Sequence, residues 1–175
     1  MKNLKICLLG SIPKGDKERK SYEDWREEYK KEISKTFPNA KFLSGDDISD
    51  NVGPELVVGH DLSLIKRANF IIVNASTKVG AGTAQEMVIA KYFKKPVISI
   101  MPRDTHNRRS NIAFHDVTMP EWIHPFLFVS SDFIAENIEE AVDWIKKTKE
   151  EIPTIKDFSI YEKLIESFES VNREQ

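Results

Sequence analysis

The feature that most constrains the fold is the stretch 69–91, in which a short apolar run, a glycine-containing loop and a segment of helical periodicity follow one another. Residues 70–73 form a continuous apolar run, which is typical of a buried strand. The loop after this run contains Gly80 and Gly82, and apolar residues then recur at helical spacing over 87–93. We therefore predict a strand, a loop and a helix in that order.

The same alternation runs along most of the chain. The predicted strands cover residues 4–9, 41–43, 70–73 and 96–101, with one more short strand after Trp122. The predicted helices cover residues 22–37, 54–68 and 134–145, a helix that begins near Gly82, and a segment after Pro153. Alternating strands and helices build a parallel sheet with helices on both faces. We predict an α/β fold: a doubly wound, Rossmann-like or flavodoxin-like domain with a sheet of about five strands.

The 175 residues are enough for one ordinary domain with a full core. We assign residues 1–150 to this domain and residues 151–175 to a C-terminal helical extension. The apolar face of the extension must be covered by the domain or by a second copy of the chain. Residues 102–120 are basic and without periodicity, so we predict a long loop, either a functional lid or a solvated surface segment.

Charge and apolar run length bear on partners and location. The formal net charge is -2, whereas binding to a phosphate polymer needs a basic face. We therefore expect neither a nucleic-acid nor a membrane partner. No apolar run approaches the roughly 20 residues of a membrane-spanning helix, and no long apolar block follows a basic one near the start. We expect a cytoplasmic protein.

The sequence lacks the motifs by which proteins of this fold class commonly bind their ligands. The first loop, from Gly10 to Gly15, is not the Gly-x-Gly-x-x-Gly of dinucleotide sites, and the nucleoside triphosphate motif Gly-x-x-x-x-Gly-Lys-Ser/Thr is absent. The histidines are scattered, and the single cysteine, Cys7, lies in the first apolar run, where we expect a buried, inert thiol. We predict no cofactor and no metal site.

Glu86 can be interpreted in two ways. Thr83-Ala-Gln-Glu86 fits a capping box, in which the side chains of Thr83 and Glu86 accept hydrogen bonds from backbone N–H groups at the helix start. Alternatively, a carboxylate in the first turn of a helix stays ionised near neutral pH, as a glycosidic nucleophile must. Gly80 and Gly82 would then let a ligand approach the backbone closely. These residues alone leave both interpretations open.

Three segments together resemble the nucleoside 2-deoxyribosyltransferase superfamily, which includes the 2'-deoxynucleoside 5'-phosphate N-hydrolases. The first is Gly10-Ser11-Ile12 after the first strand, with Tyr22 at the start of the next helix. The second is Asp61, on a helix that leads into a strand. The third is Gly82-Thr83-x-x-Glu86, which is similar to the family's glycine-rich loop and nucleophilic glutamate. The order and spacing of the segments match the family over more than half of the chain.

The resemblance implies cleavage or transfer at the N-glycosidic bond of a nucleoside or its 5'-monophosphate. Glu86 would be the nucleophile that forms a covalent glycosyl-glutamate, and Asp61 would bind the base and supply or relay a proton. The implied substrate-binding residues are Gly10, Ser11, Ile12, Tyr22, Gly80, Gly82 and Thr83. Family members often complete the pocket across a subunit interface, so the resemblance also implies a homodimer or higher homo-oligomer.

The sequence leaves several possibilities open. Gly80 stands where the phosphate hydrolases tend to have a phosphate-binding serine, so both free nucleoside and 5'-monophosphate remain candidates, as do hydrolysis and transfer. The loop from Gly80 to Glu86 also resembles part of the Pro-Gly-Gly-x-Gly-Thr-x-x-Glu loop of the lysine-decarboxylase-like phosphoribohydrolases. The same pocket could instead serve a non-catalytic nucleotide-sensing module, and residues 103–109 could serve a nucleic-acid binder.

Overall fold

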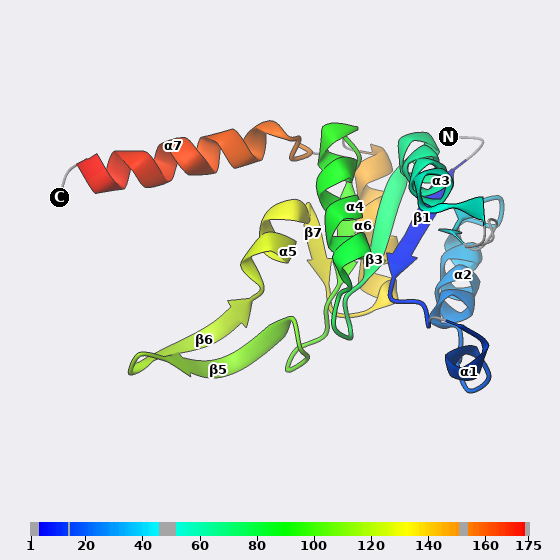
Figure 1. Ribbon diagram of the computed structural model, residues 1–175, viewed down its shortest axis with the longest axis horizontal. Helices are drawn as coiled ribbons and strands as arrows, with labels where there is room; N and C mark the ends of the chain where they lie inside the picture. The colour runs from blue at the N-terminus through cyan, green and yellow to red at the C-terminus, as the bar shows by residue number, and fades with distance from the viewer. Residues whose placement is uncertain (1–3, 14, 46–51, 151–153, 174–175) are drawn as a thin grey trace.

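The computed structural model of the protein describes residues 4–13, 15–45, 52–150 and 154–173. Five strands form a parallel sheet in the order β2-β1-β3-β4-β7. They are β1 (Lys5–Gly10), β2 (Lys41–Leu43), β3 (Phe70–Asn74), β4 (Val97–Ile100) and β7 (Phe133–Ala135). The chain first adds β2 on one side of β1 and then β3 on the other, which is the flavodoxin-like order. The predicted α/β fold is confirmed (Figure 1).

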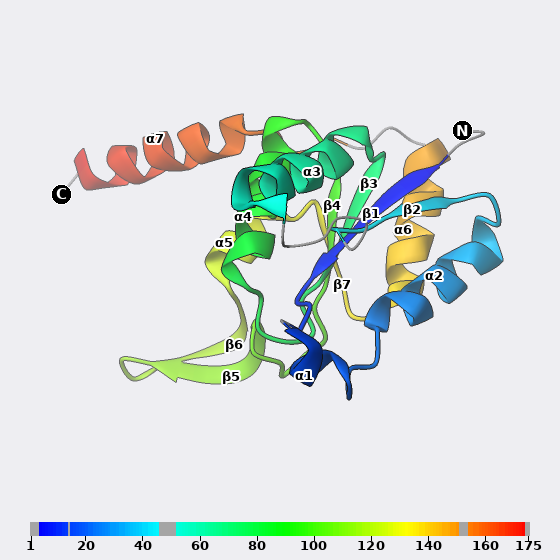
Figure 2. The same ribbon diagram turned by 45° about the vertical axis from the view of Figure 1, so that its right-hand side comes forward.

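Helices cover both faces of the sheet (Figure 2). The helices of the described residues are α1 (Gly15–Arg19), α2 (Trp25–Thr36), α3 (Pro54–Arg67), α4 (Ala81–Tyr92), α5 (Pro125–Ser130), α6 (Ile138–Glu150) and α7 (Ser159–Arg173). Successive side chains of a strand point to opposite faces, so each strand contributes to two cores. Ile6 and Ile72 pack with α2 and α6 on one face, whereas Ile71 and Val73 pack with α3, α4 and α5 on the other.

Some helix boundaries differ from the prediction. The second helix begins at Trp25, because Asp24 caps it by accepting a hydrogen bond from the Arg26 backbone N–H at 3.0 Å. Residues 133–135 form β7 by pairing with β4. The first two residues of the predicted helix 134–145 are therefore strand. The unpredicted α5 begins at Pro125, a residue suited to the first helical position. The short strand predicted after Trp122 is β7, and a strand of three residues is too short for periodicity to fix its bounds.

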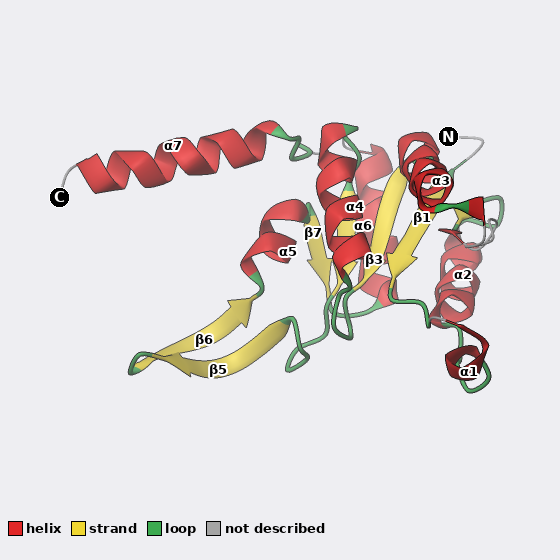
Figure 3. Ribbon diagram, viewed as in Figure 1, coloured by secondary structure: helices red, strands yellow, loops and turns green. Residues whose placement is uncertain are grey.

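The prediction of a long loop over residues 102–120 is wrong. Two antiparallel strands, β5 (Arg108–Phe114) and β6 (Val117–Ile123), form a hairpin that projects from the sheet (Figure 3). The two turn residues, His115 and Asp116, have φ values of 47° and 66°, as a tight hairpin turn requires. The hairpin could not be predicted from the sequence for two reasons. Its turn lacks the usual Asn-Gly pair, and its strands have no buried face that would require apolar and polar residues to alternate.

The helix predicted after Pro153 is present as α7, which projects beyond the sheet on the same side as the hairpin (Figures 1 and 2). The predicted domain boundary at residue 151 lies outside the described residues. Within the part of the chain that the structure describes, no helix is both long and apolar enough to cross a membrane.

Candidate active site

A small cavity of about 60 Å³ lies at the carboxyl end of β1. Both predicted catalytic carboxylates line it, Asp61 from α3 and Glu86 from α4. The full lining is Cys7, Leu8, Leu9, Gly10, Ile12, Gly45, Asp61, Leu64 and Glu86. The strand order reverses between β1 and β3, and ligands of doubly wound sheets bind at such a switch point. The fold thus brings together two carboxylates that are far apart in the sequence.

Glu86 has an environment that differs from the predicted one. Burial, and secondly the negative charge of Asp61, raise the pKa of Glu86 from 4.5 to about 7. The helix α4 begins at Ala81 with Gly80 as its N-cap and has no acidic residue in its first turn. Glu86 therefore lies in the second turn, and the capping-box interpretation is wrong. With a pKa of about 7, the carboxyl group is only partly ionised at neutral pH, whereas the second interpretation expected an ionised carboxylate.

Asp61 is held beside the cavity by two neighbours that the sequence did not reveal. One of its carboxylate oxygens lies 3.2 Å from His60 Nδ1. Gly45 packs against the same group, because a Cβ at this position would lie 3.0 Å from Asp61 Oδ1. A side chain at residue 45 would displace the carboxylate, so the glycine leaves room for it. This role of Gly45 depends on the contact between the chain after β2 and α3, so it can be seen only in the structure.

Cys7 lines the same cavity from the middle of β1. It is fully buried, and burial, together with the charges of Glu86 and Asp61, raises its pKa to about 12. The thiol therefore stays protonated at physiological pH and is a poor nucleophile. The prediction that this cysteine is buried is confirmed.

The loop after β1 closes one side of the site. Gly10 and Ile12 line the cavity, and a Cβ on Gly10 would approach Trp25 Cζ2 to 2.7 Å, so only glycine fits there. Ser11 is exposed and points elsewhere: its hydroxyl donates to the Lys78 carbonyl at 3.0 Å. This hydrogen bond links the loop after β1 to the loop after β3.

The remaining predicted substrate-binding residues are not among those that line the cavity. Gly80 and Gly82 are exposed at the start of α4, and a Cβ on either would meet nothing within 4 Å. Thr83 is buried within the first turn of α4. Tyr22 lies between α1 and α2, where its backbone N–H donates to the Arg19 carbonyl at 3.3 Å.

Asn107, at the base of the hairpin, is a buried residue that sequence analysis missed. Its side-chain amide donates to the carbonyls of Ala75 and Thr77, at 2.9 and 2.6 Å, and only 2% of the residue is exposed. These bonds fix the loop that joins β3 to α4. In the sequence, Asn107 sits in an apparently irregular stretch, and no local pattern marks it as buried.

Replacing Asn107 with leucine should lower the free energy of unfolding by about 2–3 kcal/mol, because the Ala75 carbonyl would lose its buried donor. Urea denaturation would measure the loss. Ser76→Ala is a matched control in the same loop: it removes the partly exposed bond from Ser76 Oγ to Asn74 Oδ1 and should cost less than about 1 kcal/mol. Equal losses in the two variants would contradict the role given to Asn107.

Within the described residues, no group of three or more His, Cys, Asp or Glu side chains is placed to hold a metal ion. No family model matches the sequence, and no curated protein does. Among solved structures, the chain is similar to the CMP N-glycosidase BcmB of Clostridium botulinum, with 16% sequence identity and a TM-score of 0.44. That alignment covers 81% of this chain and 98% of the other.

Proposed function

We propose that the protein cleaves or transfers the N-glycosidic bond of a nucleoside or a nucleoside 5'-monophosphate. The observation that carries the proposal is that Glu86 and Asp61 line one cavity at the switch point of the sheet. Cleavage of a glycosidic bond needs one carboxylate to meet the positive charge that develops on the anomeric carbon, and an acid to protonate the leaving group. A pair of carboxyl groups in one buried site can divide these tasks.

Glu86 is the nucleophile in this proposal. Its carboxylate oxygen forms a bond to the anomeric carbon while the bond from that carbon to the base nitrogen breaks, and the base takes a proton supplied or relayed by Asp61. Water then attacks the glycosyl-glutamate and releases the sugar, or a second base attacks it and gives a new nucleoside; the bond from the anomeric carbon to the Glu86 oxygen breaks, and the proton of the attacking group passes to or through Asp61. In both cases the Glu86 carboxylate is restored.

The cavity is the reacting end of a larger site. About 60 Å³ accommodates roughly two water molecules, whereas pockets for whole ligands measure about 300–1,000 Å³. The anomeric carbon would lie at the cavity, and the base and any phosphate would lie outside its mouth. The substrate-binding roles proposed for Ser11, Tyr22, Gly80, Gly82 and Thr83 require contacts in that outer part.

The deciding experiment is chromatographic detection of free base after incubation with deoxy- and ribonucleosides and their 5'-monophosphates, with and without a second base. Base release from a deoxy substrate would support the proposal, and a new nucleoside would make the protein a transferase. Release from ribonucleoside monophosphates alone would favour a phosphoribohydrolase. Saturable binding of nucleotides with no release would overturn the proposal in favour of a sensing module.

The rate of base release should rise with pH and level off above about pH 7. Glu86 must be ionised to attack, and its pKa in the free protein is raised to about 7. Below that value kcat/KM should therefore fall about tenfold for each pH unit. Initial rates at low substrate concentration between pH 5 and 9 would test this. A rate that stays constant down to pH 5 would show that Glu86 does not act as the ionised nucleophile.

A further inference from the structure

Two parts of the molecule extend away from the sheet on the same side, the hairpin β5–β6 and the helix α7, with α5 between them (Figures 1 and 2). Each presents large apolar side chains to solvent. Neither feature belongs to the proposed active site, and what each of them binds does not depend on the proposed function.

The start of α7 is fixed to the sheet domain. The Lys156 backbone N–H donates to Asp132 Oδ1 at 2.7 Å, and the hydroxyls of Tyr161 and Ser130 form a 2.8 Å hydrogen bond. The ring of Phe158 packs edge-on against Tyr92, with a centroid separation of 6.5 Å. These contacts set the direction in which the rest of the helix projects.

Beyond its first turns, α7 exposes an apolar stripe. Leu164, Ile165 and Val171 are 44%, 59% and 59% exposed, and Phe168, on the same face, is 70% exposed. Helical segments of this length are marginal in water unless an apolar face packs against another surface. We therefore expect another surface to cover this stripe.

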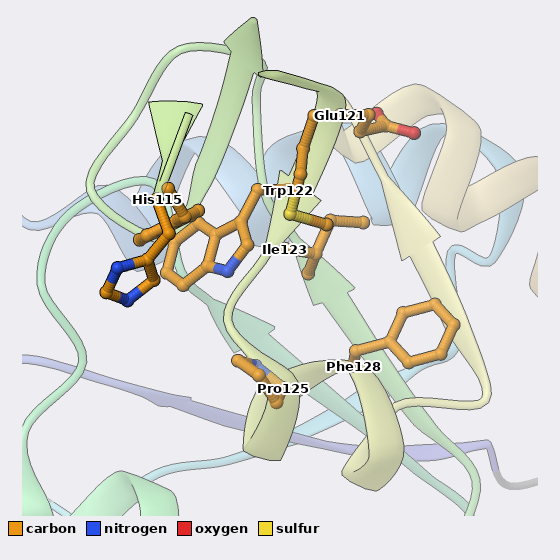
Figure 4. Close-up of a pocket in the computed structure, with 8 residues that line it drawn as sticks. His115, Glu121, Trp122, Ile123, Pro125 and Phe128 are labelled. Atoms are coloured by element: carbon orange, nitrogen blue, oxygen red, sulfur yellow. The ribbon is translucent and has the colours of Figure 1, made fainter. Parts of the chain in front are cut away.

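A groove of about 710 Å³ lies between the hairpin and α5. It is lined by Phe114, His115, Met119, Glu121, Trp122, Ile123, Pro125 and Phe128. Figure 4 shows Trp122 of the hairpin and Pro125 and Phe128 of α5 around it. Exposed apolar side chains rim the groove.

The hairpin is held rigidly at its base. The guanidinium of Arg108 is buried and donates to the Glu121 carboxylate at 2.8 Å and to the Met101 carbonyl at 3.2 Å. Arg103 donates to Glu136, just after β7, at 2.7 Å. The groove is therefore formed before any partner arrives, which lowers the entropic cost of filling it.

We propose that α7 of a second copy of this chain lies in the groove between the hairpin and α5, and that the first copy's α7 lies in the second copy's groove. A helix with an apolar stripe in an apolar groove is a common mode of recognition, and the reciprocal exchange gives a closed two-fold dimer. Four side chains of α7 and three exposed apolar side chains of the groove contribute roughly 100 Å² each. The sum of about 700 Å² per copy falls within the roughly 600–1,000 Å² that each partner buries in a standard interface. The groove side chains counted are Phe114, Met119 and Phe128.

Sedimentation of the full chain should give twice the 20.2 kDa of one copy. Ile165→Glu on α7 and Met119→Glu on the hairpin should each raise the dissociation constant of the dimer at least about tenfold. Ser170→Glu adds the same charge on the opposite face of α7 and should leave the dimer intact. Circular dichroism would verify that each variant is folded. A monomeric wild-type protein, or a dimer that withstands both substitutions, would overturn the proposal.

Cross-linking identifies which surfaces meet. Copies carrying Ile165→Cys, mixed with copies carrying Met119→Cys, should be joined by a bismaleimide, whereas either variant alone should not. Cys7 is buried and protonated, so it gives no background. If Ile165→Cys copies link to one another instead, α7 pairs with α7, and the groove is not its binding site.

Discussion

Replacing Glu86 with glutamine should abolish base release and, at the same time, stabilise the protein above pH 7. The first effect follows from the proposed covalent step, because an amide cannot form the glycosyl ester, and a loss of at least about a thousandfold is expected. The second effect follows from the raised pKa of the buried carboxyl group. A single substitution would thus separate the chemical role of this side chain from its cost to stability.

The sign of the stability effect can be worked out from that pKa. Between pH 4.5 and about 7 the folded chain holds the Glu86 proton and the unfolded chain has released it, so the free energy of unfolding falls as pH rises. A rise from 4.5 to about 7 corresponds to about 3 kcal/mol, at 1.36 kcal/mol for each pH unit. Glutamine carries no charge, so the Glu86→Gln variant should avoid this loss.

Urea denaturation at pH 5 and pH 8 would measure the effect. Relative to the wild type, the Glu86→Gln variant should gain about 2.5 kcal/mol between the two pH values, because a small part of the loss has already occurred at pH 5. Glu166→Gln, at an exposed position on α7, serves as the control and should follow the wild type. An inactive variant without the gain at pH 8 would show that Glu86 is not a destabilised carboxylate. A variant with near-normal base release would refute the nucleophile assignment.

Replacing Asp132 with alanine should be among the most destabilising single substitutions in the sheet domain. Its carboxylate forms a buried ion pair with Lys91 and accepts the Val97 backbone N–H at 2.7 Å, and both charged side chains are almost fully enclosed. Burial lowers the pKa of Lys91, and the charge of Asp132 opposes that shift. Without Asp132, a buried ammonium group would remain uncompensated, at a cost of about 3–5 kcal/mol.

The same measurement, urea denaturation at pH 7, would test this with two comparisons. Asp143→Ala changes an exposed aspartate on α6 and should stay within about 0.5 kcal/mol of the wild type. The double variant Lys91→Met with Asp132→Leu removes both charges and should be more stable than Asp132→Ala alone. If the double variant is the less stable of the two, the ion pair itself, and not the stranded charge, accounts for the loss.

The sheet could be predicted because its central strands are continuous apolar runs. β1 and β3 are buried on both faces, so nearly every residue in them is apolar, and that signal is visible without any structure. The hairpin gave no such signal, because most of its side chains are exposed and neither face of it is buried as a whole. The last strand, β7, was predicted as a short strand after Trp122 but without bounds, because it is strand only where β4 offers a pairing edge.

The candidate site was only partly accessible to sequence reasoning. Asp61 and Glu86 could be named from the resemblance of their surroundings, and the structure places both at one cavity. The start of α4 at Ala81 could not be foreseen, because Gly80 caps the helix without a side-chain signature. The sequence analysis therefore placed Glu86 in the first turn, whereas it lies in the second, and it did not reveal the burial that raises the pKa of its carboxyl group. Gly45 and Asn107 depend on contacts between distant segments, which no local pattern records.

Hydrogen bonds from two other segments hold the loop from β3 to α4 in place. Asn107 binds it from the hairpin, and Ser11 binds it from the loop after β1. The Ser11 bond also fixes the loop after β1, whose Gly10 and Ile12 line the cavity, so the conformational entropy of that part of the cavity wall is lost when the chain folds, and not when a ligand arrives. A molecule that enters the cleft meets a surface already in its final shape, so its affinity is not reduced by the cost of ordering that surface.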